Sequence, residues 1–184
     1  DIHPVNSPWT GPGFATAYAA IADLLGLGAV APAQRLEALA RLAPAGDHAW
    51  ARPLLQRTSS GLAFAPETRA AVDDAGAADL LAGRPAGVTA AAALLARLGD
   101  LVVEHLTTVR ERVGLADLCL GGSLFRQSSM TTRAKQSALF DRVFVPVDPG
   151  DGGLAVGAAL HGLGAAPALT SPFLGPAYSA EEIK

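Results

Sequence analysis

With 184 residues, the chain is long enough for one domain with a real core or for one lobe of a larger protein. Hydrophobic residues make up 50% of it but aromatic residues only 5%, so a core has to be built from Ala, Leu and Val. The formal net charge of -3 and the scattering of 14 Lys and Arg residues argue against a nucleic-acid partner, which needs clustered positive charge.

A single cysteine, Cys119, excludes an intrachain disulfide and a cysteine-based zinc site. Because it lies within an apolar run, we expect a buried side chain rather than a reactive thiol. The apolar runs are short and are interrupted by charge, Gly or Pro, so we expect no membrane span and no membrane partner. The first residues, Asp1–Pro4, hold no basic or apolar leader, which indicates a cytoplasmic location.

Helical patterns dominate the first part of the chain. After an irregular start rich in Pro and Gly, apolar residues spaced by three and four predict helices over Phe14–Leu27 and Pro32–Leu42. Asp47–Gln56 is predicted as a further short helix and Leu62–Phe64 as a small strand, and a polar helix is expected to begin at Pro66.

The longest helical pattern runs over Val88–Val113 and is ended by Gly114. His105 lies on or beside its apolar stripe. No second His, Cys or carboxylate stands four residues away, so we interpret His105 as a satisfied core or boundary histidine rather than a metal ligand. Trp9 and Tyr18 are candidates for lining a cleft, although aromatic side chains at helical spacing belong more often to the core.

Two Gly-rich turns organise the segment from Asp117 onward. We expect a strand at Leu118–Leu120, a Gly-Gly-Ser turn at Gly121–Ser123 and a polar helix at Ser128–Ser137. A second strand near a sheet edge is expected at Val143–Val147, followed by a Pro-Gly-Asp-Gly-Gly turn at Pro149–Gly153 and an Ala-rich helix at Leu154–Leu160. Each turn follows a strand, so its backbone N–H groups could face an anion or a metal-bound phosphate.

Three stretches of the chain read LCLGGSLFRQ, FDRVFVPVDPGDGGLAVGAAL and SPFLGPAYSAEEI. They resemble LCLAGGVALN, FDRVFVPP-PGDAG-LALGAAL and SPYLGPSYSEEEI in the carbamoyltransferase family of natural-product and nodulation-factor biosynthesis. The match extends from Leu118 to Ile183 and is weaker before it. It implies a helix-rich α/β fold with a small sheet packed by helices, namely one lobe of an actin-like ATPase (ASKHA, Kae1-like) domain.

The resemblance also implies a domain organisation. Residues 1–165 would form the second lobe of that domain, with a helical part at 14–113 and a nucleotide- and metal-facing βαβα unit at 117–165. Residues 166–184, rich in proline, would be a linker toward a further domain.

The family's site residues can be carried over by position. The resemblance implies that Asp151 holds a divalent metal (Fe, Mg or Mn), and that the residues facing ATP are Gly121, Gly122, Ser123, Gln127, Gly150 and Gly152. The other metal ligands of the family are two histidines of an HxxH motif, and His3, His48, His105 and His161 do not have that spacing. ATP and the metal would therefore bind only together with a partner lobe, supplied by an N-terminal-lobe chain or by a homo-oligomer.

Two functions stay open at this point. In the first, the chain contributes to ATP-dependent transfer of a carbamoyl group from carbamoyl phosphate to a small-molecule hydroxyl or amine. In the second, it is a degenerate, non-catalytic scaffold or regulatory partner, because Ser123, Gln127 and Thr131 stand where the family has Gly, Asn and Asn. A Cβ at the position of Ser123 can obstruct the close approach of a nucleotide to the backbone.

Overall fold

The computed structural model describes residues 9–46, 48–164, 178–179 and 181–182. The predicted linker therefore lies almost entirely outside the described residues. The elements in chain order are α1 (Phe14–Leu24), α2 (Pro32–Ala40), η1 (Ala49–Ala51), β1 (Leu55–Arg57), β2 (Leu62–Phe64), α3 (Thr68–Leu81), α4 (Val88–Val113), β3 (Asp117–Cys119), η2 (Ser123–Arg126), α5 (Ser128–Gln136), β4 (Arg142–Phe144) and α6 (Gly152–Leu163). The fold is helix-rich α/β with small sheets, as the sequence predicts.

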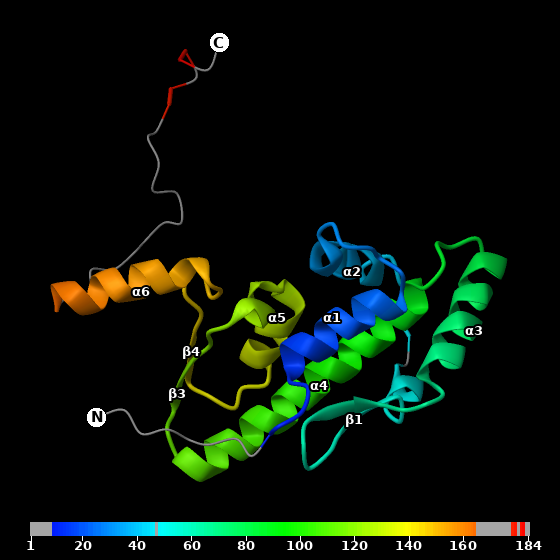
Figure 1. The fold of residues 1–184 in the computed structure, drawn as a ribbon, viewed down its shortest axis with the longest axis horizontal. Coiled ribbons are helices and arrows are strands. Elements are labelled where there is room, and N and C mark those ends of the chain that lie inside the picture. The colour runs from blue at the N-terminus through cyan, green and yellow to red at the C-terminus, as the bar shows by residue number, and fades with distance from the viewer. Residues whose placement is uncertain (1–8, 47, 165–177, 180, 183–184) are drawn as a thin grey trace.

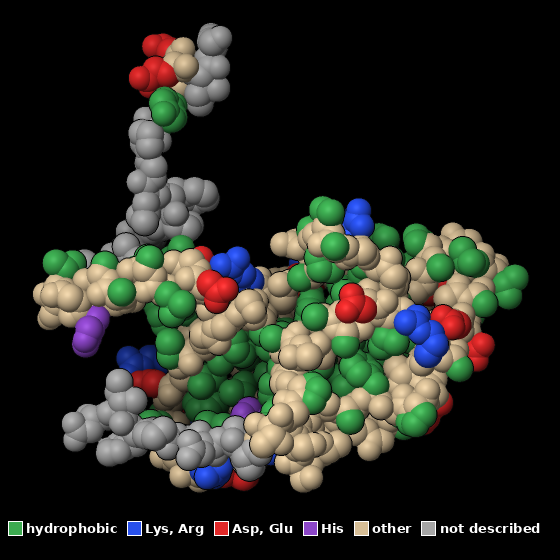
Figure 2. Space-filling model, in the orientation of Figure 1, with side chains coloured by type: hydrophobic (Ala, Val, Ile, Leu, Met, Phe, Trp, Pro, Cys, Tyr) green, Lys and Arg blue, Asp and Glu red, His purple; other side chains and the backbone are tan. Residues whose placement is uncertain are grey.

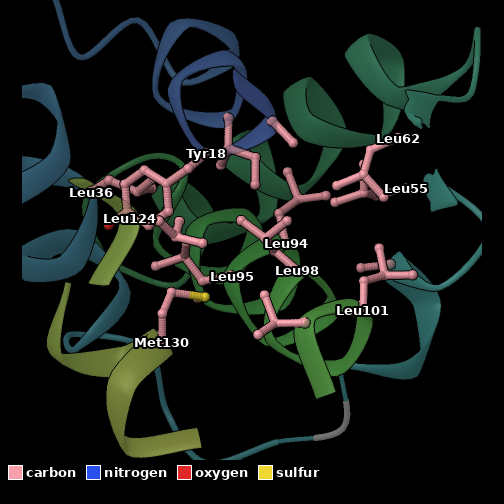
Figure 3. Packing of buried hydrophobic residues seen from close by; sticks show 14 of the residues in the cluster. Tyr18, Leu36, Leu55, Leu62, Leu94, Leu95, Leu98, Leu101, Leu124 and Met130 are labelled. Carbon is pink, nitrogen blue, oxygen red and sulfur yellow. The ribbon is translucent and has the colours of Figure 1, made fainter. Parts of the chain in front are cut away.

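The long helix α4 is the axis on which the other helices pack. Its ends are set by two glycines, Gly87 and Gly114, which both adopt the left-handed conformation that side chains disfavour. Helices α1, α2, α3 and α5 and the short η1 all contact it (Figure 1). Figure 3 shows Leu94, Leu95, Leu98 and Leu101 of α4 at the centre of the hydrophobic cluster. Full burial of one such leucine contributes about 1.5 to 3 kcal/mol.

A carboxylate from α3 caps the start of α4. Gly87 has no side chain to cap the helix, and the buried Asp79 accepts hydrogen bonds from the Thr89 backbone N–H (2.9 Å), the Thr89 hydroxyl (2.6 Å) and Arg84 Nε (3.1 Å). Burial by itself would raise the pKa of Asp79, but the hydrogen bonds from Thr89 and the guanidinium of Arg84 bring it below its ordinary value. Asp79 is therefore ionised at neutral pH and ties α3 to α4.

The strands form two separate pairs. β1 and β2 are an antiparallel hairpin, in which Leu55 lies opposite Phe64. β3 and β4 are parallel, with Asp117 opposite Arg142 and Cys119 opposite Phe144. Within the described part of the chain neither strand of this second pair has another neighbour.

Residues 142–164, which we call the arm, project from the helical body (Figure 1). They comprise β4, the second Gly-rich turn and α6. None of the described residues of α6 is buried, and Leu154 and Leu163 are 72% and 71% exposed. Figure 2 shows hydrophobic side chains spaced along this helix. On β4, Phe144 is 63% exposed, so the arm presents apolar side chains to solvent on both of its elements.

Several expectations from the sequence need correction. Cys119 is exposed, not buried, because successive side chains of a strand point to opposite faces and in β3 it is Leu118 that packs against the core. The predicted helix at 47–56 is instead the single turn η1 followed by β1, since Leu55 pairs with Phe64; residue 47 lies outside the described residues. β4 ends at Phe144, two residues before Pro146, which has no N–H to donate to a ladder.

No helix in the described ranges is both long enough and apolar enough to cross a bilayer. The 26-residue α4 is long, but charged residues interrupt it along its length.

Candidate functional site

The parallel pairing of β3 and β4 brings the two Gly-rich turns together. The carboxyl ends of parallel strands lie at the same edge, so the segments that follow them become neighbours. The contact is direct: the Gly122 backbone N–H donates to the carbonyl oxygen of Pro149 at 2.5 Å. Residues 121–127 and 149–153, which are about 25 positions apart in sequence, therefore border one region.

The first turn leads into the single helical turn η2. Gly122 has a φ of 106°, a conformation that favours glycine. Ser123 and Gln127 line a small cavity of about 180 Å³ together with Tyr18 and several alanines from α1 and α2. Drug-sized ligands typically occupy about 300 to 1,000 Å³, so this cavity is too small for a whole nucleotide.

Tyr18 forms the buried wall of that cavity. Its hydroxyl donates to the carbonyl oxygen of Ala33 at 3.2 Å, and its ring belongs to the core. Burial, together with the negative charge of Glu37, raises the pKa of Tyr18 far above its ordinary value, so it acts as a neutral donor. The expectation that an aromatic residue at helical spacing joins the core is confirmed for Tyr18.

The second turn is built around Asp148 and Arg126. Asp148 Oδ1 accepts the Gly150 backbone N–H at 3.0 Å and Arg126 Nη2 at 2.7 Å. A Cβ at Gly153 would collide with the backbone oxygen of Asp148, and one at Gly150 would lie 2.6 Å from Arg126 Nε. Gly153 is therefore needed for the close approach of the chain to itself, whereas the contact at Gly150 is with the end of a flexible arginine side chain. Arg126 of η2 bridges the two turns.

A family model described as Carbamoyltransferase N-terminus matches residues 69–160, which is half of the chain. The chain belongs to the carbamoyltransferase family. The match begins at the start of α3 and ends in α6, so it includes α4, both Gly-rich turns and the strands that bring them together. No curated protein matches the chain.

The residues of this carbamoyltransferase-family chain do not by themselves fit a metal ion. Asp151 is exposed at the N-cap of α6, and its carboxylate makes no capping bond. Within residues 9–46 and 48–164, no three His, Cys, Asp or Glu side chains are grouped closely enough to hold an ion. A metal at Asp151 would need ligands from outside the described residues, and its role as a ligand stays a prediction.

His105 lies away from the turns, in an aromatic cluster with Trp9 and Phe14. The ring centroids of Trp9 and His105 are 5.2 Å apart, and the guanidinium of Arg57 lies 5.4 Å from the Trp9 ring. Burial and the charge of Arg57 lower the pKa of His105. Its buried Nδ1 has no hydrogen-bond partner among the described residues, so the prediction of a satisfied histidine was wrong for that atom.

Three residues of this region escape sequence reasoning. Asp148 and Arg126 shape the second turn, and Glu37 of α2 binds the start of α5. An Asp two residues before a Gly is a turn signal that could have identified Asp148. Nothing in the sequence pairs Glu37 with Ser129, since 92 positions separate them.

Proposed function

We propose that the chain supplies the nucleotide-facing turns of an ATP-dependent carbamoyltransferase. In the complete reaction, carbamoyl phosphate, ATP and one water molecule give a carbamoyl adenylate, phosphate and pyrophosphate, with the water taking the phosphoryl group of carbamoyl phosphate. The hydroxyl or amine of a small molecule then takes the carbamoyl group and releases AMP. The observation that carries the proposal is the meeting of both turns at the carboxyl ends of β3 and β4, inside the family match.

Gly121, Gly122, Ser123 and Gln127 would border the nucleotide on the first turn, and Gly150 and Gly152 on the second. The guanidinium of Arg126 is half exposed and, among the described residues, makes one ion pair, with Asp148, which leaves other N–H groups available to a phosphate. The 180 Å³ cavity beside Ser123 supports a partial site only. The rest of the site has to come from another part of the enzyme.

The arm supports the need for such a partner. A parallel sheet is normally covered on both faces, whereas β3 and β4 form a two-stranded pair with the exposed Phe144 and Val147 beside it. The partner would be an HxxH-bearing N-terminal lobe or a second copy of the chain, and together they would form the actin-like ATPase domain. The small hydrophobic helix α6 would then lie inside the completed domain.

A second candidate is a non-catalytic scaffold or regulatory partner. The observations that favour it are the Ser, Gln and Thr at positions 123, 127 and 131 and the absence of a three-ligand metal group among the described residues. The two candidates differ in whether the turns bind a nucleotide.

The test is equilibrium binding of ATP, with Mg²⁺ present, to the full chain alone and with a co-expressed HxxH-bearing chain. We expect binding in the mixture that falls by about tenfold or more in Asp151→Ala and is unchanged in Asp141→Ala. Asp141 is the matched control because it is an exposed carboxylate at the opposite end of β4. Formation of a complex without ATP binding would favour the scaffold function. If the chain formed no complex with the HxxH-bearing chain or with a second copy of itself, the proposal that it requires a partner would be wrong.

A further inference from the structure

A second, larger cavity lies between α4, the last turn of α5 and the residue that follows η1. Its volume is about 570 Å³, against about 180 Å³ for the cavity beside Ser123, and falls within the range of small-molecule sites. None of the residues that line it belongs to either Gly-rich turn. Most of the lining is charged, and the charged residues are Arg52, Arg97, Asp100, Glu104 and Arg133.

Arg97 forms a fixed part of the cavity wall. Its side chain is only 14% exposed, and its Nε donates to the carbonyl oxygen of Leu55 at 2.9 Å while its Nη1 donates to Glu104 Oε1 at 3.0 Å. Its Nη2 makes no hydrogen bond within the described part of the chain. A guanidinium with so little contact with water needs acceptors for its N–H groups. The Nη2 donors are therefore left for a group that enters the cavity.

Arg133 of α5 forms a second part of the wall and is positioned by a glycine of α4. A Cβ at Gly99 would collide with Cδ of Arg133, so the bare backbone at this position gives the arginine room to cross α4. Beyond Gly99, Arg133 Nη2 pairs with Asp100 Oδ1. The charge of Arg133 is therefore balanced within the wall itself.

The charges of the lining leave one positive charge over. Arg97 pairs with Glu104, and Arg133 pairs with Asp100. Arg52 is exposed, and its guanidinium has no ion pair or hydrogen bond with any described residue. A carboxylate carries the single negative charge that balances Arg52, and its two oxygens match the geometry of a guanidinium. A phosphate dianion carries more charge than Arg52 balances and would be repelled by the carboxylates of Asp100 and Glu104.

We propose that this cavity binds a small organic monocarboxylate. Arg52 and the Nη2 group of Arg97 would hold the carboxylate, and the carbon chain of the ligand would lie beside Val103, the apolar residue of the lining. The site goes beyond the proposed function and does not depend on it, because it shares no residue with the two Gly-rich turns.

The test is a titration of the full, isotope-labelled chain with sodium propionate at constant ionic strength, followed by NMR. The signals to follow are the Nε–H of Arg97, which is bonded to the Leu55 carbonyl, and the backbone amides around Val103. We expect a saturable shift of these signals with propionate. Propionamide has the same shape without the charge and should give none, and sodium phosphate should bind at least about fivefold more weakly than propionate.

Arg52→Gln removes the unbalanced charge and should weaken propionate binding by at least about fivefold. The side chain is exposed, so the variant is expected to fold. The matched control is Arg112→Gln, an exposed arginine at the end of α4 that lies outside the cavity lining and has no ion pair with a described residue; it should bind as the natural chain does. The proposal is wrong if the natural chain shows no saturable shift, if propionamide or phosphate binds as tightly as propionate, or if Arg52→Gln leaves the affinity unchanged.

Discussion

The two apolar helices α4 and α6 show how differently one kind of sequence can be used. Both are rich in Ala and Leu, yet eleven residues of α4 are buried and none of the described residues of α6 is. Helix α4 is surrounded by α1, α2, α3 and α5, whereas α6 projects on the arm (Figure 1). Burial therefore reflects which neighbours the fold provides, and not the hydrophobicity of the segment alone.

The difference matters for the site, because the two Gly-rich turns lie where the body meets the arm. The first turn runs into η2 and α5, which pack on the body. The second runs into α6, whose contacts with the rest of the chain are few. We expect the first turn to be rigid in the isolated chain and the second to depend on whatever covers the arm.

The largest change in the free energy of unfolding is expected when a leucine of α4 is shortened, and only a small part of that change when a leucine of α6 is shortened in the same way. Leu98 of α4 is fully buried, so Leu98→Ala leaves a cavity and should lower the free energy of unfolding by about 2 to 5 kcal/mol. The matched change Leu154→Ala on α6 removes the same atoms from a side chain that is 72% exposed, and we expect an effect within about 0.5 kcal/mol. Urea unfolding of both variants measures this, and equal losses would contradict the comparison.

A smaller effect concerns the cap of α4. Asp79→Asn removes a buried charge that accepts three hydrogen bonds, so it should lower the free energy of unfolding by about 1.5 to 3 kcal/mol at pH 7. The pKa of Asp79 is lower in the folded state than in the unfolded state. The stability that its charge contributes is therefore fully present above the unfolded-state pKa of about 3.9 and is lost as the pH falls through the lower folded-state pKa.

Urea unfolding between pH 7 and pH 2 checks this expectation. The gap in stability between the natural chain and Asp79→Asn should narrow below about pH 4. A gap that stayed constant over this range would show that the charge of Asp79 is not what stabilises the start of α4.

The smallest effect is expected on the arm. Gly157 lies inside α6, and a Cβ there would meet no atom within 4 Å, so Gly157→Ala should stabilise the helix by about 1 kcal/mol or less. Gly153→Ala should destabilise the start of α6, because the added Cβ would collide with the backbone of Asp148. Amide hydrogen exchange in α6 distinguishes them: slower exchange in both variants would contradict the close packing of the second turn.

Much of the local structure could be predicted from the sequence. The spacing of apolar residues gave α4 its observed ends, Val88 and Val113, and located α1, α2 and α5 to within a few residues. Periodicity failed near residue 50, where strand pairing with Phe64 overrides a weak helical pattern. It also failed at Cys119, since an apolar run predicts burial only if a neighbouring element covers it.

The sequence by itself determined where most of the helices lie to within a few residues, because glycines and the 3.6-residue period act over short distances. It also placed the chain in the carbamoyltransferase family through the residues of its two turns. Only the tertiary structure decided that Asp79 caps α4, that Glu37 occupies the start of α5 and that α6 is left uncovered. These features depend on contacts between distant segments, and the physical reason is that a charge or an apolar face acts on its neighbours in space, which no local pattern specifies.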